Sequence, residues 1–141
     1  MHIEEKIAQI PSLPGMVILK LVAWNDRPEE RENDLSDILR IIQHFYDLEF
    51  DDIADHHYDL LATDILDELL VSAEVLGRKC RIYLEKSTTL SDRITGILKN
   101  ELTINEKSAI ARDWARKLDK DVNYASSIIR AFQRGILSKK E

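Results

Sequence analysis

Cysteine, glycine and proline are scarce in this chain of 141 residues, and each shortage excludes something. The single cysteine, Cys80, excludes an intrachain disulfide and argues against a cysteine-based zinc site. No apolar run approaches the ~20 residues that a helix needs to cross a bilayer. No phosphate-cradling glycine loop, serine-hydrolase elbow or dinucleotide fingerprint is present. The sequence therefore offers neither a disulfide scaffold, nor a membrane span, nor a familiar nucleotide loop.

What is abundant favours helices. The chain is 44% hydrophobic and 33% charged, with only 4 Gly and 3 Pro to form turns. Apolar residues recur at helical spacing from Met16 to Ile136, and no segment alternates with the period of a strand. We expect one all-α domain over residues 1–141, a compact bundle of about five to seven helices with room for one short strand before Pro11.

Polar residues mark where these helices should begin and end. Ser12, Asn33 and Ser87 are placed to cap three of them, and Thr103 with Glu106 has the spacing of a capping box. Gly135 should stop or fray the last helix. The first ten residues include Glu4, Glu5 and Lys6 and show no apolar targeting core, so we expect a cytoplasmic protein without membrane contact.

Charge is distributed unevenly along the chain. Residues 1–75 hold 5 Lys/Arg and 18 Asp/Glu, a net of −13, whereas residues 76–141 hold 15 Lys/Arg and 8 Asp/Glu, a net of +7. Two explanations stay open. The two halves pack together and attract one another, or the basic half offers a local face to the phosphates of a nucleotide or RNA.

One lysine, Lys20, interrupts nine otherwise apolar residues from Met16 to Trp24. A cation on an apolar helix needs water or a partner, and Asp34 and Asp37 lie three apart on one face of the next predicted helix. We therefore predict that the Lys20 ammonium pairs with Asp34 or Asp37. The same residues are consistent with a structural ion-pair network between two helices or with one half of a site.

Two adjacent histidines, His56 and His57, stand among several aspartates, which raises the question of a metal site. No third ligand follows at a set spacing, so a solvated acidic helix end is the preferred interpretation. Trp24 and Trp114 lie on apolar stripes and are predicted to be core residues.

The stretch SLPGMVILKLVAWNDRPEERENDLSDI resembles the C-terminal helical part of AbiEii-type, toxin-like bacterial nucleotidyltransferases. In that family a lysine in an apolar helix is followed by an arginine and then by a D-x-x-D pattern. The matching positions here are Lys20, Arg31, Asp34 and Asp37. The similarity extends through HYDLL and LGRK to most of the chain, but its specific part covers only about 20 residues.

The resemblance implies roles for these residues. Lys20, Asp34 and Asp37 take the catalytic positions, with the lysine facing nucleotide phosphates, while Arg27 and Arg31 would help to bind phosphate. The intact family uses Mg²⁺ and an NTP, held by a glycine-serine turn and paired acids on an upstream sheet that this sequence lacks. We therefore expect a helical half that is catalytically incomplete alone and holds no cofactor alone. Its partners would be a nucleotide or RNA acceptor, a separate N-terminal catalytic half, or an antitoxin.

Two other functions remain open. The chain could be a helical protein–protein interaction or regulatory module without nucleotide chemistry. It could also be a complete enzyme whose metal-binding acids come from another copy in an oligomer.

Overall fold

The computed structural model describes residues 12–138 and forms seven α-helices with two short 3-10 helices. In chain order these are α2 (Leu13–Asp26), α3 (Glu32–Leu48), α4 (Phe50–His56), η1 (Tyr58–Leu60), α5 (Glu68–Leu84), α6 (Thr88–Ile104), η2 (Asn105–Lys107), α7 (Ala109–Leu118) and α8 (Val122–Leu137). No strand occurs between residues 12 and 138, which confirms the all-α class. The strand expected before Pro11 lies outside the described residues.

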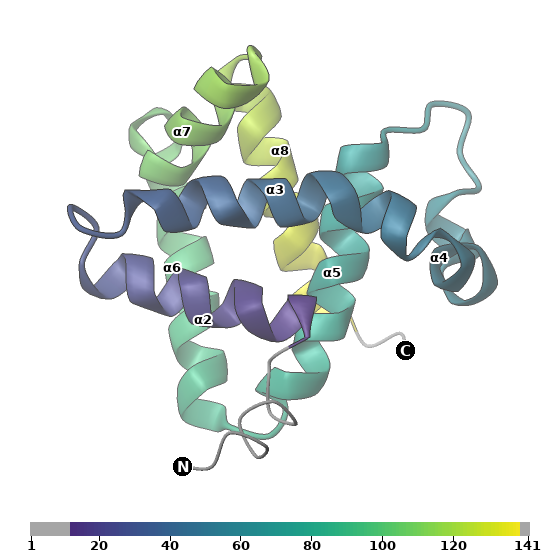
Figure 1. Ribbon diagram of the computed structural model, residues 1–141, viewed down its shortest axis with the longest axis horizontal. Coiled ribbons are helices and arrows are strands. Elements are labelled where there is room, and N and C mark those ends of the chain that lie inside the picture. The colour runs from purple at the N-terminus through teal and green to yellow at the C-terminus, as the bar shows by residue number, and fades with distance from the viewer. Residues whose placement is uncertain (1–11, 139–141) are drawn as a thin grey trace.

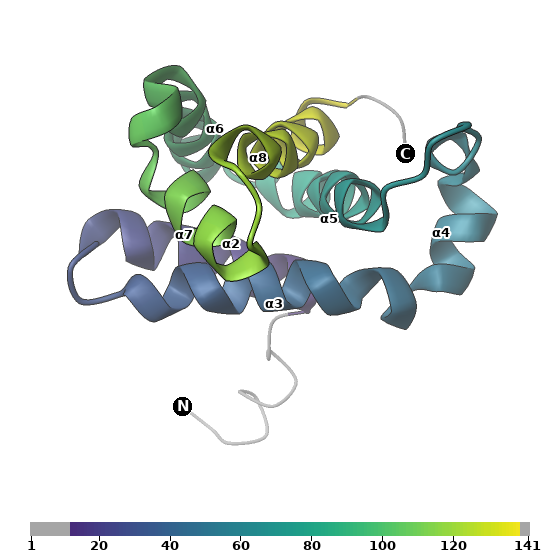
Figure 2. The same ribbon diagram turned by 90° about the horizontal axis from the view of Figure 1, so that it is seen from above.

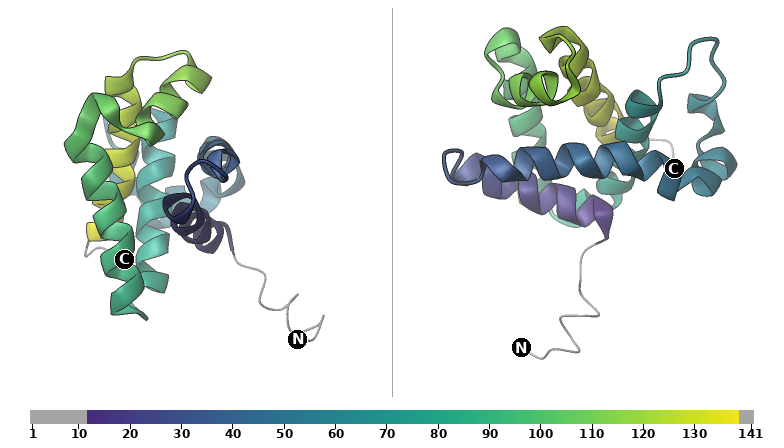
Figure 3. Two further views of the ribbon diagram at one scale, coloured as in Figure 1. Left: turned by 90° about the vertical axis from the view of Figure 1, so that its left-hand side faces the viewer. Right: turned by 45° about the horizontal axis from the view of Figure 1, so that its top comes forward.

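The helices form two layers (Figure 1). Helices α2 and α3 run antiparallel as one layer, and α5, α6 and α8 form the second layer, which the first crosses steeply (Figure 2). Helix α7 packs beside α3 and α8, while α4 turns away from the end of α3 and leads back towards α5. The edge-on view shows the α2–α3 pair lying against one side of the other helices (Figure 3).

The main core lies between the two layers. Leu21 of α2, Ile38 of α3, Leu98 of α6 and Ile129 of α8 are all buried and line one small internal space. Burial of such side chains contributes about 1.5–3 kcal/mol each to folding, because apolar surface leaves water. Both layers therefore depend on their contact for stability.

The two tryptophans belong to this core, as predicted. Trp24 is 6% exposed and Trp114 is 4% exposed. The indole N–H of Trp114 donates a hydrogen bond of 2.9 Å to the carbonyl oxygen of Leu35. This bond satisfies the polar edge of a buried ring and links α7 to α3.

Two of the predicted caps are confirmed. The Ser12 hydroxyl accepts from the amide of Gly15 at the start of α2, and the Ser87 hydroxyl accepts from Leu90 at the start of α6. The cap at Asn33 is wrong, because α3 already begins at Glu32 and has no side-chain cap. An acidic first turn stabilises that helix end instead.

The predicted capping box at Thr103 and Glu106 is also wrong. Thr103 lies within α6, where its hydroxyl donates to the carbonyl of Lys99. Helix α7 begins later and is capped by the buried Ser108, which also donates to the carboxylate of Glu101 at 2.6 Å. The Glu101 carboxylate in turn accepts from the amide of Ile110.

Gly135 does not end the last helix, because α8 continues to Leu137. It lies instead where α8 meets α5, directly opposite Gly77. A Cβ atom on Gly77 would lie 2.3 Å from the carbonyl oxygen of Phe132, and one on Gly135 would lie 2.1 Å from that of Glu74. The absence of both side chains lets the two backbones approach closely.

Among residues 12–138, no helix combines the length and the apolar character required of a membrane span.

Candidate functional site

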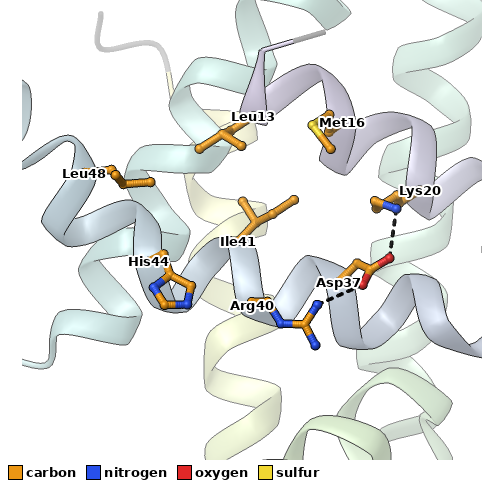
Figure 4. A pocket seen from close by; sticks show the side chains of 8 residues that line it. All are labelled: Leu13, Met16, Lys20, Asp37, Arg40, Ile41, His44 and Leu48. Carbon is orange, nitrogen blue, oxygen red and sulfur yellow. Dashed lines mark hydrogen bonds and ion pairs between the residues drawn. The ribbon is translucent and has the colours of Figure 1, made fainter. Parts of the chain in front are cut away.

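The structure brings Lys20 to both predicted partners. Its Nζ lies 3.0 Å from Oδ2 of Asp37 and 3.6 Å from Oδ1 of Asp34, which confirms the predicted ion pair (Figure 4 shows the Asp37 bond). The Asp34 side chain is only 5% exposed, whereas that of Lys20 is 22% exposed. Lys20 therefore runs its stem along an apolar helix and places its charge at the edge of the core.

Two arginines complete this cluster. Arg31 donates to both oxygens of Asp34, at 2.7 Å from Nε and 3.1 Å from Nη2. This bond to the Asp34 carboxylate raises the pKa of Arg31, which is charged in any case. Arg40 donates to Asp37 at 3.2 Å. We call Lys20, Arg31, Asp34, Asp37 and Arg40 the Lys20 cluster.

A short reversal of the chain positions the cluster. Residues 27–31 form a turn in which the amides of Glu30 and Arg31 both donate to the carbonyl of Arg27. The turn folds α3 back along α2, so that one face of the first turns of α3 meets Lys20. Because Asp34 and Asp37 are three residues apart, both carboxylates lie on that face.

Three members of the Lys20 cluster, Lys20, Asp37 and Arg40, form one end of an open groove between α2 and α3, with a volume of about 410 Å³ (Figure 4). Half of the side chains that line the groove are apolar, and the others are charged or polar. The lining residues are Leu13, Met16, Lys20, Asp37, Arg40, Ile41, His44 and Leu48. Arg40 and His44 were missed by the sequence reasoning, although Arg40 follows Asp37 by three residues and His44 follows Arg40 by four, so that all three share one helical face.

Arg27 does not join the cluster. Its guanidinium lies 3.6 Å from the carboxylate of Glu30, and these side chains are 73% and 69% exposed. Of the two arginines that the resemblance assigns to phosphate, only Arg31 contacts the aspartates of the motif. The exposed pair of Arg27 with Glu30 stabilises the fold little.

Cations of the basic half pair with carboxylates of the acidic half. Bonds or ion pairs join Arg78 to Asp59, Lys79 to Asp52, Arg93 to Asp26, and Arg134 to Glu74. Mutual attraction of the two halves, the first explanation of the charge asymmetry, is thus supported by specific contacts. Arg78 and Lys79 are engaged with these carboxylates on α4 and η1 and have no contact with the Lys20 cluster.

The two histidines have different surroundings. The His56 side chain is 68% exposed and lies 3.0 Å from Asp52, whereas the His57 side chain is only 6% exposed. The interpretation as a solvated acidic end is therefore wrong for His57. Among residues 12–138, no group of three or more His, Cys, Asp and Glu side chains is placed to hold a metal.

The thiol of Cys80 is buried, and its Sγ donates to the carbonyl oxygen of Pro14 at 3.4 Å. Burial raises the pKa of the Cys80 thiol far above its usual range, which keeps it protonated. Cys80 is therefore a small core residue and not a nucleophile.

Comparison of the chain with protein families, curated proteins and solved structures found no match.

Proposed function

We propose that this chain is the helical C-terminal half of an AbiEii-type nucleotidyltransferase-like protein of the bacterial cytoplasm. In this proposal it attracts a phosphate-bearing ligand at the Lys20 cluster and transfers nothing by itself. The observation that carries the proposal is the convergence of Lys20, Arg31, Asp34 and Asp37, the four positions of the family motif, in one ion-pair cluster. Two of these residues, Lys20 and Asp37, line the end of the groove.

Charge and size both support an anionic ligand of modest affinity. The Lys20 cluster has three cations and two carboxylates, so one positive charge remains beside the groove. Ligand pockets usually measure about 300–1,000 Å³, and the groove falls in this range. The cluster is partly exposed, so salt should weaken the attraction, because exposed charges are largely screened from one another beyond ~8 Å at physiological ionic strength.

The cluster does not suit the magnesium ion that the family uses. Both oxygens of Asp34 accept from Arg31, and those of Asp37 contact Lys20 and Arg40. A metal at either carboxylate would have to displace these cations. Phosphoryl transfer needs a cation bridging the phosphates, so in this proposal the acids that hold it belong to a separate N-terminal catalytic half.

A second candidate is a helical interaction or regulatory module without nucleotide chemistry, for which an antitoxin is one possible partner. The apolar part of the same groove favours it: Leu13, Met16, Ile41 and Leu48 line the groove, and Leu48 is 66% exposed. An apolar groove of this kind is a common seat for a partner helix.

Titration with each of the four NTPs and Mg²⁺ at low salt separates the two candidates. We expect weak binding that falls as salt rises and is lost in Lys20→Met, which keeps the apolar stem. Arg116→Ala is the control, because it also removes one cation that pairs with an aspartate, Asp113 at 2.8 Å, but at a site that does not line the groove. No binding at low salt, or equal loss in both variants, would favour the interaction module.

A further inference from the structure

His57 contacts a permanent cation inside the protein. Its Nδ1 lies 3.0 Å from Nη1 of Arg78, and each of the two side chains is only 6% exposed. Arg78 also donates two hydrogen bonds to the carboxylate of Asp59, at 3.1 and 2.7 Å. These contacts tie the segment after α4 to the middle of α5.

The contact with Arg78 determines which form of His57 fits. A guanidinium has only donors, so the Nδ1 atom facing it must accept. The ring is therefore neutral, with its proton on Nε2. That nitrogen lies 3.7 Å from Oδ2 of Asp52, too far for a direct hydrogen bond.

We propose that His57 is a proton-operated latch, which holds residues 57–67 against α5 while its ring is neutral and releases them when the ring is protonated. Protonation would place an N–H against an N–H and two positive charges 3.0 Å apart. The latch is independent of the Lys20 cluster and of the proposed function.

The charges around His57 do not compensate for an added proton. They come from every element that packs there: Asp52 from α4, Asp59 from η1, Glu74, Arg78 and Lys79 from α5, and Arg134 from α8 through Glu74. Each of the three carboxylates already faces a cation. Burial first, and Arg78 second, lower the pKa of His57, against a smaller opposing effect of Asp52.

The direction of the pH effect follows from this lowered pKa. In the open state His57 meets water and titrates near its ordinary value of 6.5. Above that pH both states are neutral and the latch stays closed. As pH falls through 6.5 towards the lower pKa of the closed state, protonation favours opening, by about tenfold for each pKa unit between the two states.

The far end of the segment is anchored. The side chain of Asp67 caps α5 through the amide of Leu70 and accepts from the hydroxyl of Tyr124 at 2.7 Å. Opening therefore moves the part before Asp67, where Tyr58 and Ile65 are already 63% and 86% exposed. Leu60 and Leu61 pack partly buried against the core, and the contacts of Arg78 with His57 and Asp59 supply the buried polar attachment of the segment.

Amide hydrogen exchange of the full chain, corrected for the intrinsic effect of pH, tests the latch. We expect residues 57–67 to exchange faster at about pH 5 than at about pH 7.5, with α6 and α8 unchanged. The variant His57→Gln offers Arg78 an acceptor that does not titrate, so its segment should stay protected at both pH values. The matched variant His56→Gln should keep the pH response. A response that survives in His57→Gln, or is absent from the wild-type chain, would overturn the latch.

A second measurement needs no variant. Nitrogen-detected NMR of the wild-type histidines reports the tautomer and the pKa of His57 directly. The latch requires a proton on Nε2 and a pKa below 6.5. A proton on Nδ1 at neutral pH, or a pKa of 6.5 or above, would contradict it.

Discussion

Lys20 shares its charge with two aspartates that differ in their exposure to water. Asp34 is nearly buried, while the Asp37 side chain is 35% exposed. Each aspartate also has its own arginine, Arg31 for Asp34 and Arg40 for Asp37. The lysine is therefore one member of a network in which no carboxylate depends on it alone.

That arrangement predicts a small effect of Lys20→Met on stability. Both aspartates keep an arginine, and methionine fills the apolar path of the lysine stem, so the free energy of unfolding should fall by about 1 kcal/mol or less. Urea denaturation measures this change in the free energy of unfolding, provided that its slope against urea concentration is the same for both proteins. A loss of about 3 kcal/mol or more is typical of a broken buried pair. It would show that Arg31 and Arg40 do not compensate the aspartates for the loss of Lys20.

The α5–α8 crossing is the closest helix contact among the described elements, and it depends on two glycines. A side chain at Gly77 would meet the backbone of Phe132, which cannot rotate away as a side chain would. Separation of the helices would in turn loosen the core between the layers.

Gly77→Ala should therefore lower the free energy of unfolding by about 3 kcal/mol or more, through overpacking against backbone. Gly96→Ala is the matched control: Gly96 also lies within a helix, and nothing lies within 4 Å of an added Cβ. There alanine should stabilise by about 0.5–1 kcal/mol, because glycine is a poor helix former. Thermal denaturation gives the comparison. If the melting temperatures of both variants shifted in the same direction, the close approach of α5 and α8 at Gly77 would be contradicted.

Local patterns in the sequence were enough to predict the helices and the pairing of Lys20. Ser12 and Ser87 act on amides three residues away, and Asp34 and Asp37 share a face through helical spacing, so both features are local. The cap of α7 was missed although it is also local, since the Ser108 hydroxyl accepts from the amide of Ala111, three residues away. What local spacing does not indicate is the bond of Ser108 to the buried Glu101, seven residues earlier. Gly135 was misread because its role depends on Gly77, which is distant in sequence.

The groove was less predictable than the ion pair at its end. Its volume depends on how side chains of α2 and α3, up to 35 residues apart in sequence, face one another across the gap between the helices (Figure 4). The burial of His57 likewise depends on a contact with Arg78 of α5, 21 residues away, which no pattern around His56 indicates.

At the scale of the whole molecule, the acidic and basic halves are joined by ion pairs, and the pair of Asp52 with Lys79 responds to acid. The pKa of Asp52 is lowered, mainly by the hydrogen bond from Lys79 and also by His56. A carboxylate with a lowered pKa contributes stability that is present above its ordinary value, 3.8, and is lost as pH falls through its value in the folded state.

Lys79→Met removes the main cause of that shift. The variant should be less stable than the wild-type chain near neutral pH, and the difference should shrink as the pH falls from about 5 to about 3. Denaturant midpoints measured across this range give the comparison. If the difference in stability between the two proteins stayed constant or grew towards low pH, the Lys79–Asp52 pair would not be the source of that difference.

The most direct test of the central claim, a phosphate-attracting helical half that is incomplete as an enzyme, is a transfer assay. Purified chain is incubated with labelled NTP, Mg²⁺ and total RNA, with Lys20→Met in parallel. We predict no metal-dependent transfer of label to RNA or to the protein itself. Metal-dependent transfer by the wild-type chain that disappears in Lys20→Met would contradict the account and would show that its own aspartates do the metal chemistry.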